Sequence, residues 1–375
     1  MTKRQYLETG LRREMTAAGV DAVIGVSPEN VQHLAGVFIA SQRMISERLA
    51  FAVYRRDGAP FFVVSTVVQY TARTQSWIEE IVPYSEHATL PIEGLVQALR
   101  DRGLDRARVW IEMGYLPARD ADLLRKALPK MEILDAETVL NRSRMVKTEE
   151  EIRHMTQIAG VWEAAIEAGY RATKAGESER AIAQRLVHNL QAGGADWVPF
   201  FSFASGPERT LISHSVPDDT RVGPGQIMRL DMVGFFRGYY TDYGRMAIIG
   251  EPTAPQRDAY RKIITLQREM IARVKPGRRA SDLYRESVSI GKQLGMEFSM
   301  DAIGHSLGLR LHEYPILNPH EEETLVPNML LCVEIAHPFK GLGLFHVEDL
   351  VRVGERGGER LTTRIDTADM LVVGQ

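Results

Sequence analysis

The stretch LDMVGFFRGYYTDYGRM, residues 230–246, contains two apolar segments joined by a short turn. Both segments are rich in β-branched and aromatic residues, which is typical of strands buried in a sheet. Gly238 suits a tight turn, so we expect a β-hairpin in which Asp231 ends the first strand and Asp242 lies in the second. Paired residues of neighbouring strands lie roughly 5 Å apart, so the hairpin can bring the two carboxylates side by side.

Two carboxylates at that separation repel each other unless a positive group lies between them. A bound cation between Asp231 and Asp242 would remove the repulsion. Each acid taken alone is explained as simply by a solvated position at the end of a strand. The hairpin by itself is therefore compatible both with a bound cation and with two solvated acids at strand ends.

A second segment, GHSLGLRLHEYP at residues 304–315, contains two histidines seven positions apart. On one unbroken strand His305 and His312 would face opposite sides, because seven is odd. Gly304 and Gly308 favour a curved or bulged path that turns both rings toward one cleft. The alternative, that each histidine is a separate core or surface residue, remains open.

Two glutamates interrupt strands that are otherwise apolar, Glu334 in LLCVEIAHPF and Glu348 in LFHVEDLVRV. A carboxylate inside an apolar strand is costly unless it is paired, hydrogen bonded or bound to a metal. These are the strongest single-residue indications in the chain. For Glu348, which precedes another acid, exposure on an edge strand is the competing explanation.

The surroundings of these four segments divide the chain into two expected domains. Residues 1–143 alternate apolar strand patterns (21–26, 49–54, 60–65 and 108–113) with helical ones (94–103 and 118–128), which predicts an α/β domain. A capping box of Thr148 and Glu151 begins a long helix, and further helices are expected from Ser178, over 254–274 and over 280–294. With strands at 227–233, 239–249, 329–335 and 345–353, residues 144–375 are predicted to form an α+β domain.

The composition excludes several classes of function. With 44% apolar and 25% charged residues and a net charge of −3, the chain is typical of a globular protein without a nucleic-acid or anionic-membrane partner. No segment has the roughly 20 consecutive apolar residues of a membrane span. The single cysteine, Cys332, indicates a reducing environment and lies in an apolar run, so we expect a buried thiol in a cytoplasmic protein.

The order of these residues resembles the pita-bread metallopeptidases: Xaa-Pro dipeptidase (prolidase), Xaa-Pro aminopeptidase, methionine aminopeptidase and the metal-free relative creatinase. The hairpin matches the family's Asp, Gly-Tyr, Asp, Arg segment, and GHSLGLRLHE matches its Gly-His-Gly-x-Gly-x-x-x-His-Glu segment. The resemblance covers nearly the whole chain. It implies a creatinase/prolidase-like N-terminal α/β domain, a pita-bread catalytic domain and a homodimer.

Carried over residue by residue, the resemblance implies two divalent ions bound by five residues, of which Asp242 and Glu348 bridge both ions: Asp231, Asp242, His305, Glu334 and Glu348. It assigns the proton of the attacking hydroxide to Glu334 and contacts with the substrate to His312 and His214. Four carboxylates and one imidazole suit Mn²⁺, with Zn²⁺, Co²⁺ and Fe²⁺ as alternatives. The expected reaction is hydrolysis of an amide bond in an Xaa-Pro dipeptide or another proline-containing peptide.

Three positions depart from the family pattern. Ser306 replaces the glycine after the metal-binding histidine, Ala336 lies where a glycine follows the fourth ligand, and His346 replaces an arginine. None removes a metal ligand, but such groups set substrate selectivity. One alternative is therefore a hydrolase or lyase with the same metals that acts on a small non-peptide compound. A separate alternative, from a different class, is a non-catalytic pita-bread binding module, although members of that kind lose metal ligands and this chain keeps all five.

Overall fold

The structure is a computed structural model that describes residues 2–297 and 300–374. It divides into two units, Met1–Arg144 (unit 1) and Met145–Gln375 (unit 2), each treated separately below. Among the described residues, no helix has the length and apolar character needed to cross a membrane.

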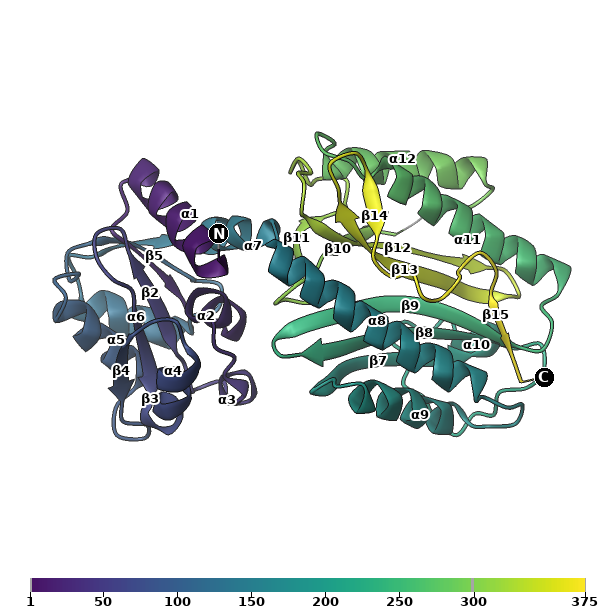
Figure 1. Cartoon of the computed structure of the whole chain (residues 1–375), viewed down its shortest axis with the longest axis horizontal. Coiled ribbons are helices and arrows are strands. Elements are labelled where there is room, and N and C mark those ends of the chain that lie inside the picture. Colours follow the sequence, from purple (N-terminus) through teal and green to yellow (C-terminus); the bar gives the residue numbers. More distant parts are fainter. Residues whose placement is uncertain (1, 298–299, 375) are drawn as a thin grey trace. The chain divides into compact units, whose positions relative to one another are not determined.

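Unit 1 contains a six-stranded sheet in the order β4–β3–β2–β1–β5–β6 (Figure 1). Its strands are β1 (Ala22–Gly25), β2 (Phe51–Arg55), β3 (Phe61–Ser65), β4 (Glu80–Tyr84), β5 (Arg108–Ile111) and β6 (Glu132–Asp135). Its helices are α1 (Lys3–Ala18), α2 (Pro28–Ala35), α3 (Ala40–Met44), η1 (Thr66–Val68), α4 (Gln69–Gln75), α5 (Pro91–Arg100), α6 (Ala118–Ala127) and α7 (Glu137–Met145).

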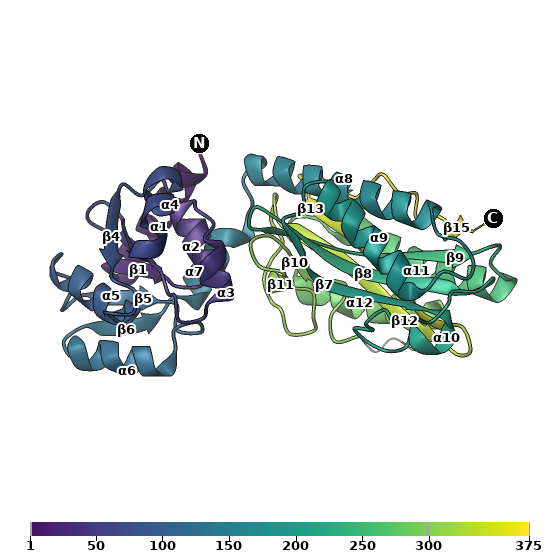
Figure 2. The same cartoon turned by 90° about the horizontal axis from the view of Figure 1, so that it is seen from below.

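Helices cover both faces of this sheet, so its strands β1, β2 and β3 are apolar on both sides. Alternate strand residues enter two separate cores: Ile24 and Val53 contribute to the core beneath α5 and α6, whereas Val23 and Ala52 contribute to the core beneath α1, α2 and α4. Figure 2 shows these two helical layers with the sheet between them. The α/β class predicted for this part of the chain is confirmed.

Unit 2 contains two sheets, in the orders β15–β9–β8–β7 and β11–β10–β12–β13–β14. Its strands are β7 (Trp197–Ser205), β8 (Ile227–Phe236), β9 (Tyr239–Ile249), β10 (Gly304–Ser306), β11 (Glu313–Ile316), β12 (Leu330–Phe339), β13 (Gly343–Val353), β14 (Gly358–Arg360) and β15 (Leu371–Val373). Its helices are α8 (Glu149–Arg171), α9 (Glu179–Ala192), α10 (Gly206–Arg209), α11 (Ala254–Arg273) and α12 (Ala280–Gln293).

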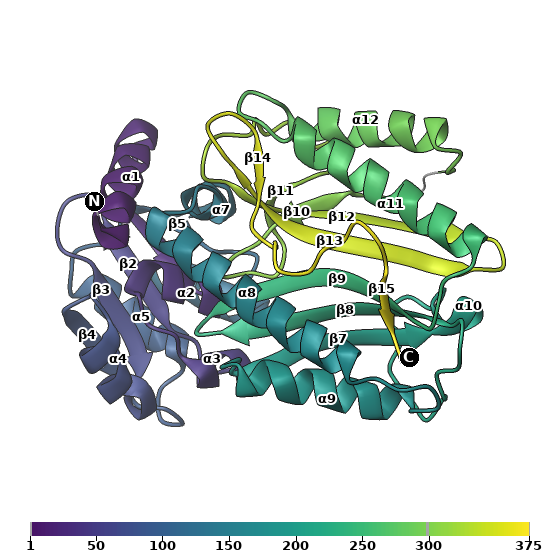
Figure 3. The same cartoon turned by 45° about the vertical axis from the view of Figure 1, so that its right-hand side comes forward.

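The two sheets of unit 2 meet along β9 and β13, and helices cover their outer faces (Figures 1 and 3). Helices α8 and α9 pack on the β7–β8–β9 layer, and α11 packs on β12 and β13. Thr148 caps α8 through the predicted reciprocal bonds with Glu151. The inner surfaces of both sheets are thereby left to face each other, and every predicted metal ligand belongs to a strand that forms them.

The predicted hairpin forms with a two-residue turn. Arg237 and Gly238 both have positive φ, 49° and 94°, as the tight turn between twisted strands requires. Asp231 does not end its strand as expected, because β8 continues to Phe236. The carboxylate therefore lies in the middle of a paired ladder rather than at a solvated strand end.

Candidate metal centre

The two acids of the hairpin lie on the same face of their sheet. Asp231 pairs with Gly244, and Asp242 pairs with Val233. Because residues two positions apart face the same side, the carboxylates are diagonal neighbours rather than a directly opposed pair. Asp242 is buried and Asp231 is half-buried. The two carboxylates are therefore neighbours as expected, but at the diagonal spacing rather than the shorter spacing of a directly opposed pair.

The two glutamates face each other directly in the second sheet. Glu334 on β12 pairs with Glu348 on β13. Glu348 is buried, and its strand is hydrogen bonded to β12 on one side and β14 on the other. Exposure on an edge strand is therefore the wrong explanation for Glu348. The Glu334 side chain is 28% exposed, so it is the member of this pair that solvent or a substrate can reach.

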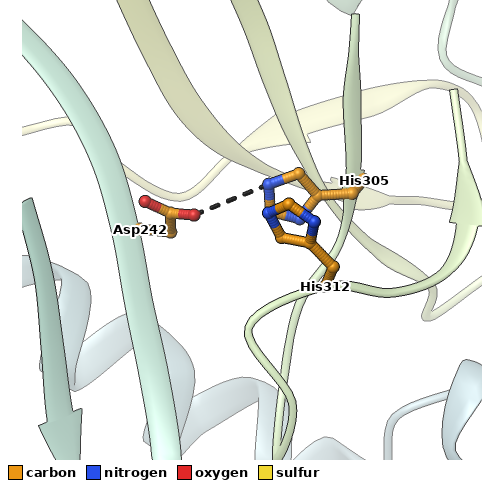
Figure 4. A group of neighbouring side chains, drawn as sticks. All are labelled: Asp242, His305 and His312. Atoms are coloured by element: carbon orange, nitrogen blue, oxygen red, sulfur yellow. Dashed lines mark ion pairs between the residues drawn. The ribbon is translucent and has the colours of Figure 1, made fainter. Parts of the chain in front are cut away.

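The orientation of the His305 ring leaves one nitrogen free to bind a metal. Its Nδ1 lies 3.0 Å from the backbone carbonyl of Ser306, and because a carbonyl only accepts, Nδ1 carries the proton. Burial lowers the pKa of His305 to about 4, so the ring is neutral at pH 7 and Nε2 holds a lone pair. Nε2 lies 3.5 Å from Oδ2 of Asp242 (Figure 4). It also lies 3.8 Å from Oε1 of Glu348, and because the ring is neutral neither contact is a salt bridge.

The side chain of His312 lies beside that of His305 because the chain reverses its direction between them. The segment from Gly304 to Pro315 is not one curved strand, because β10 and β11 pair antiparallel with a register shift after His305. The loop between them brings the two imidazoles together with ring centroids 4.0 Å apart (Figure 4). His312 is exposed where His305 is buried, so it borders the site from its open side.

Burial makes three of the four acids of this site resist ionisation. Burial, followed by the negative charges of the neighbouring acids, raises the pKa of Asp242 and of Glu348 well above the ordinary carboxyl range. Burial also raises the pKa of Asp231, although the imidazole of His346 acts in the opposite direction. For Glu334 burial raises the pKa, but the neighbouring imidazoles of His346, His305 and His312 together outweigh it and the net pKa is lowered. A divalent cation would reverse the penalty by stabilising the ionised carboxylates.

The residues suit a divalent metal. Four sets of side chains each hold ligand atoms within 4.8 Å of one another: Asp242, His305 and His312; His305, Cys332 and Glu348; Glu334, His346 and Glu348; Asp231, Asp242 and Glu348. All five predicted ligands belong to at least one set. In addition, the buried Oε1 of Glu348 finds no hydrogen-bond partner among the described residues. An orphaned carboxylate oxygen beside oxygen and nitrogen donors fits the coordination of a divalent metal.

His214 joins none of these sets within the described part of the chain. It lies exposed in the loop after α10 with a φ of 55°, and its ring contacts Phe200 edge-on at 5.2 Å. Burial dominates the pKa of Asp231, but His214 contributes to lowering it, which indicates that the two side chains interact electrostatically. His214 is thus placed near the hairpin acids rather than among the ligand atoms.

Two buried cations that are not themselves metal ligands, Lys147 and Arg245, stabilise the strands that carry the ligands. The buried Nζ of Lys147 lies 2.8 Å from Glu313 and 3.1 Å from the Ser306 hydroxyl, which ties the start of unit 2 to the His305 strand. On the other side, Arg245 donates to Asp349 at 2.7 Å and to the backbone carbonyl of Glu348. Both cations are almost fully buried.

Sequence reasoning named His346 and Arg245 as family positions without assigning either a place in the metal centre, and it did not connect Cys332 or Lys147 with the site. His346 and Cys332 each share a set with predicted ligands, and Lys147 and Arg245 support the strands. The signal for His346 was its substitution for the family arginine, two residues before Glu348. Cys332 is fully buried as expected, and burial raises the pKa of its thiol well above the ordinary value.

A separate cavity of about 660 Å³ lies in unit 1, between α1 and the segment around α7. Its charged lining consists of Arg13, Glu14, Asp135 and Arg142, and the described residues around it include no histidine or cysteine. It therefore lacks the grouped metal ligands that mark the inter-sheet site.

Carboxylates and an imidazole gathered between two sheets define the class of a metal-dependent hydrolase. Residues 153–355 match the family described as Metallopeptidase family M24, and residues 9–146 match the Creatinase/Prolidase N-terminal domain. Since the first match spans more than half of the chain, this protein belongs to metallopeptidase family M24. The resemblance and the two-part fold inferred from the sequence are confirmed.

Similar proteins agree with this assignment. The chain is 27% identical to the Xaa-Pro dipeptidase of Pyrococcus furiosus over 60% of its own length and 65% of that protein. It is 23% identical to the Xaa-Pro dipeptidase of Lactobacillus delbrueckii subsp. lactis, covering 88% and 89% of the two chains. Among solved structures, an Xaa-Pro dipeptidase from Bacillus anthracis has a TM-score of 0.87 at 21% identity, covering 99% of this chain and 100% of that chain.

Metal removal is expected to destabilise the protein more strongly at high pH. The carboxyls with raised pKa, Asp242 and Glu348, contribute stability below their unfolded pKa near 4 and lose it as pH rises through the folded pKa. A bound cation replaces the lost protons. The difference in Tm between metal-loaded and chelator-treated protein should therefore be larger at pH 8 than at pH 5, measured by differential scanning fluorimetry. A difference that stays constant or shrinks would contradict this electrostatic account.

Proposed function

We propose that this chain is a two-metal peptidase that hydrolyses Xaa-Pro dipeptides or other proline-containing peptides. The observation that carries the proposal is the grouping of Asp242 with His305 on one side and with Asp231 and Glu348 on the other. Among the carboxylates, Asp242 thus belongs to two ligand sets and Glu348 to three, as carboxylates shared by two ions would. The substrate class is supported by the similar proteins, several of which are Xaa-Pro dipeptidases.

Five residues would hold the two ions, and Asp242 and Glu348 would be shared between them: Asp231, Asp242, His305, Glu334 and Glu348. Mn²⁺ is the proposed ion, because oxygen donors outnumber the single imidazole in this set. When bound, a pair of divalent ions polarises the scissile carbonyl and lowers the pKa of water. The side chains then have to position the peptide and carry protons.

Three residues are proposed to carry out those tasks. Glu334, the partly exposed acid, accepts the proton of the attacking water on its carboxylate and delivers it to the leaving nitrogen. His312, exposed beside the buried His305, donates a hydrogen bond to the oxygen of the tetrahedral intermediate. His214, held near the hairpin acids by its contact with Phe200, faces the substrate.

We also propose residues 144–375 as the catalytic domain and residues 1–143 as the N-terminal domain. This division is supported by the two family matches, which fall on either side of it within a few residues. A cytoplasmic location is supported by the single, buried cysteine. A homodimer is supported by the family resemblance, and size-exclusion chromatography with light scattering tests it.

Metal analysis combined with a peptidase assay tests the proposed function. The purified chain should contain about two divalent ions and, with Mn²⁺ added, should cleave Xaa-Pro dipeptides faster than the same dipeptides with alanine in place of proline. Absence of bound or activating metal would contradict the proposal.

A second candidate keeps the metals and changes the substrate. Ser306, Ala336 and His346 replace family residues close to the ligands, and such positions influence selectivity. Bound metal without turnover of any dipeptide would favour a hydrolase or lyase of small non-peptide compounds.

A further inference from the structure

His346 is buried among the acids of the metal centre. It is 2% exposed and pairs with Ala336 across β12 and β13. In the same ladder Glu334 pairs with Glu348, two positions away on each strand. Since residues two apart on a strand face the same side, His346 shares one face with both glutamates.

The facing sheet leaves room for this imidazole. Gly244 on β9 pairs with Asp231, and a Cβ added at Gly244 would lie 2.5 Å from Cε1 of His346. Any larger residue at Gly244 would displace the ring. The ring of His346 thus reaches across to the layer that carries Asp231, so it lies between acids from both sheets.

The nitrogens of this ring lack directed hydrogen bonds. Neither Nδ1 nor Nε2 forms one with residues 2–297 or 300–374, although both atoms are buried. Nε2 does lie 3.0 Å from Oε1 of Glu334, a charge contact that lacks the full geometry of a hydrogen bond. A buried polar atom without a hydrogen bond raises the free energy of the folded protein unless another group or a metal ion binds it.

The distances around Nε2 are those of ligands to a single ion. Two donors that are each about 2.1 Å from one metal stand about 3.0 Å apart at right angles and about 4.2 Å apart when opposite. Nε2 of His346 lies 3.0 Å from Oε1 of Glu334 and 4.0 Å from Oε2 of Glu348. All three atoms could therefore bind one cation with little movement.

We propose that Nε2 of His346 is a sixth protein ligand, binding one of the two ions together with Glu334 and Glu348. This inference rests on the proposed function, because it adds a nitrogen donor to that metal centre. Imidazole suits Zn²⁺, Co²⁺ and Fe²⁺ better than Mn²⁺. The second imidazole therefore shifts the preference of one position toward these ions, relative to a centre in which His305 is the sole nitrogen donor.

X-ray absorption spectroscopy of the full-length protein loaded with Co²⁺ tests the assignment without any substitution. Two histidines shared by two ions give an average of about one imidazole per ion, whereas His305 alone gives about half of one. An average of about one is the expected result. An average of about half in protein that binds two ions would overturn the role of His346 and leave the proposed function intact.

A variant supplies the second measurement. His346→Gln is expected to weaken Co²⁺ binding at one of the two positions by about 10–100-fold, the range found when groups that support a metal site are removed. Competition with a chromogenic chelator measures the two affinities. The matched control is His337→Gln, because His337 lies on the neighbouring strand and joins no set of metal ligands among the described residues.

The outcomes separate the two proposals. Unchanged affinities in His346→Gln would reduce His346 to a partner of Glu334 and overturn its role as a ligand. Wild-type protein that binds no Co²⁺, Zn²⁺ or Mn²⁺ would overturn the proposed function together with this inference. Loss of one tight position in His346→Gln but not in His337→Gln, with the imidazole average falling to about half of one when excess Co²⁺ fills both positions of His346→Gln, is the result the geometry predicts.

Discussion

An Asp242→Asn variant is expected to lose at least about 10³-fold in kcat/KM, equivalent to about 4 kcal/mol of transition-state stabilisation. Asp242 belongs to two ligand sets, so its charge is required at both proposed metal positions. Asparagine keeps the shape of the side chain but offers one neutral oxygen. Steady-state kinetics with Mn²⁺, together with metal analysis of the variant, measures the effect.

The fold of this variant should survive. Burial and the neighbouring acids raise the pKa of Asp242, so a neutral side chain relieves repulsion in the metal-free protein. Metal-free Asp242→Asn should therefore have a Tm equal to or above that of metal-free wild type. Asp301→Asn, at an exposed position, is the control and should change neither quantity. Retention of full activity by Asp242→Asn would contradict the assignment of this residue as a ligand.

Replacement of Arg245 by methionine is expected to produce the largest loss of stability. Its Nη2 lies 3.0 Å from Glu163 and 2.7 Å from Asp349, and all three side chains are almost fully buried. Breaking a buried ion pair leaves uncompensated charge and costs about 3–5 kcal/mol. In a unit of this size that corresponds to a fall in Tm of about 6–20 °C, measurable by calorimetry.

The matched control for this variant is Arg257→Met. Arg257 forms an exposed ion pair with Glu251 at 2.7 Å, and such pairs contribute about 0–1 kcal/mol. Metal affinity should also fall in Arg245→Met but not in the control, because Arg245 donates to the backbone carbonyl of Glu348. Equal Tm values for the two variants would contradict the role given to the buried network.

Local patterns predicted the elements that combine a strong apolar signal with clear boundaries. The hairpin of β8 and β9 and the helix capped by Thr148 are examples. Strand β6 was missed because it is polar and largely uncovered at the edge of its sheet. Strand β7 was missed because Pro199 interrupts it where its register with β8 shifts between Trp197 and Phe200.

The five predicted ligands could be recognised from the sequence, whereas the position of His346 beside them could not. Asp231, Asp242, His305, Glu334 and Glu348 occur in an order that could be recognised along the chain. The place of His346 depends on the register of β12 with β13 and on the space that Gly244 leaves on the opposite sheet. No local pattern encodes the packing of one sheet against another, so that contact required the three-dimensional structure.

Anomalous diffraction from crystals of the full chain grown with Mn²⁺ tests the central claim most directly. The claim predicts two anomalous peaks between the sheets, about 3.5–4 Å apart, with Asp242 and Glu348 contacting both. Asp231, His305 and Glu334 should each lie within bonding distance of one peak. Peaks elsewhere in the chain, or none between β9 and β13 in protein that cleaves peptides, would contradict it.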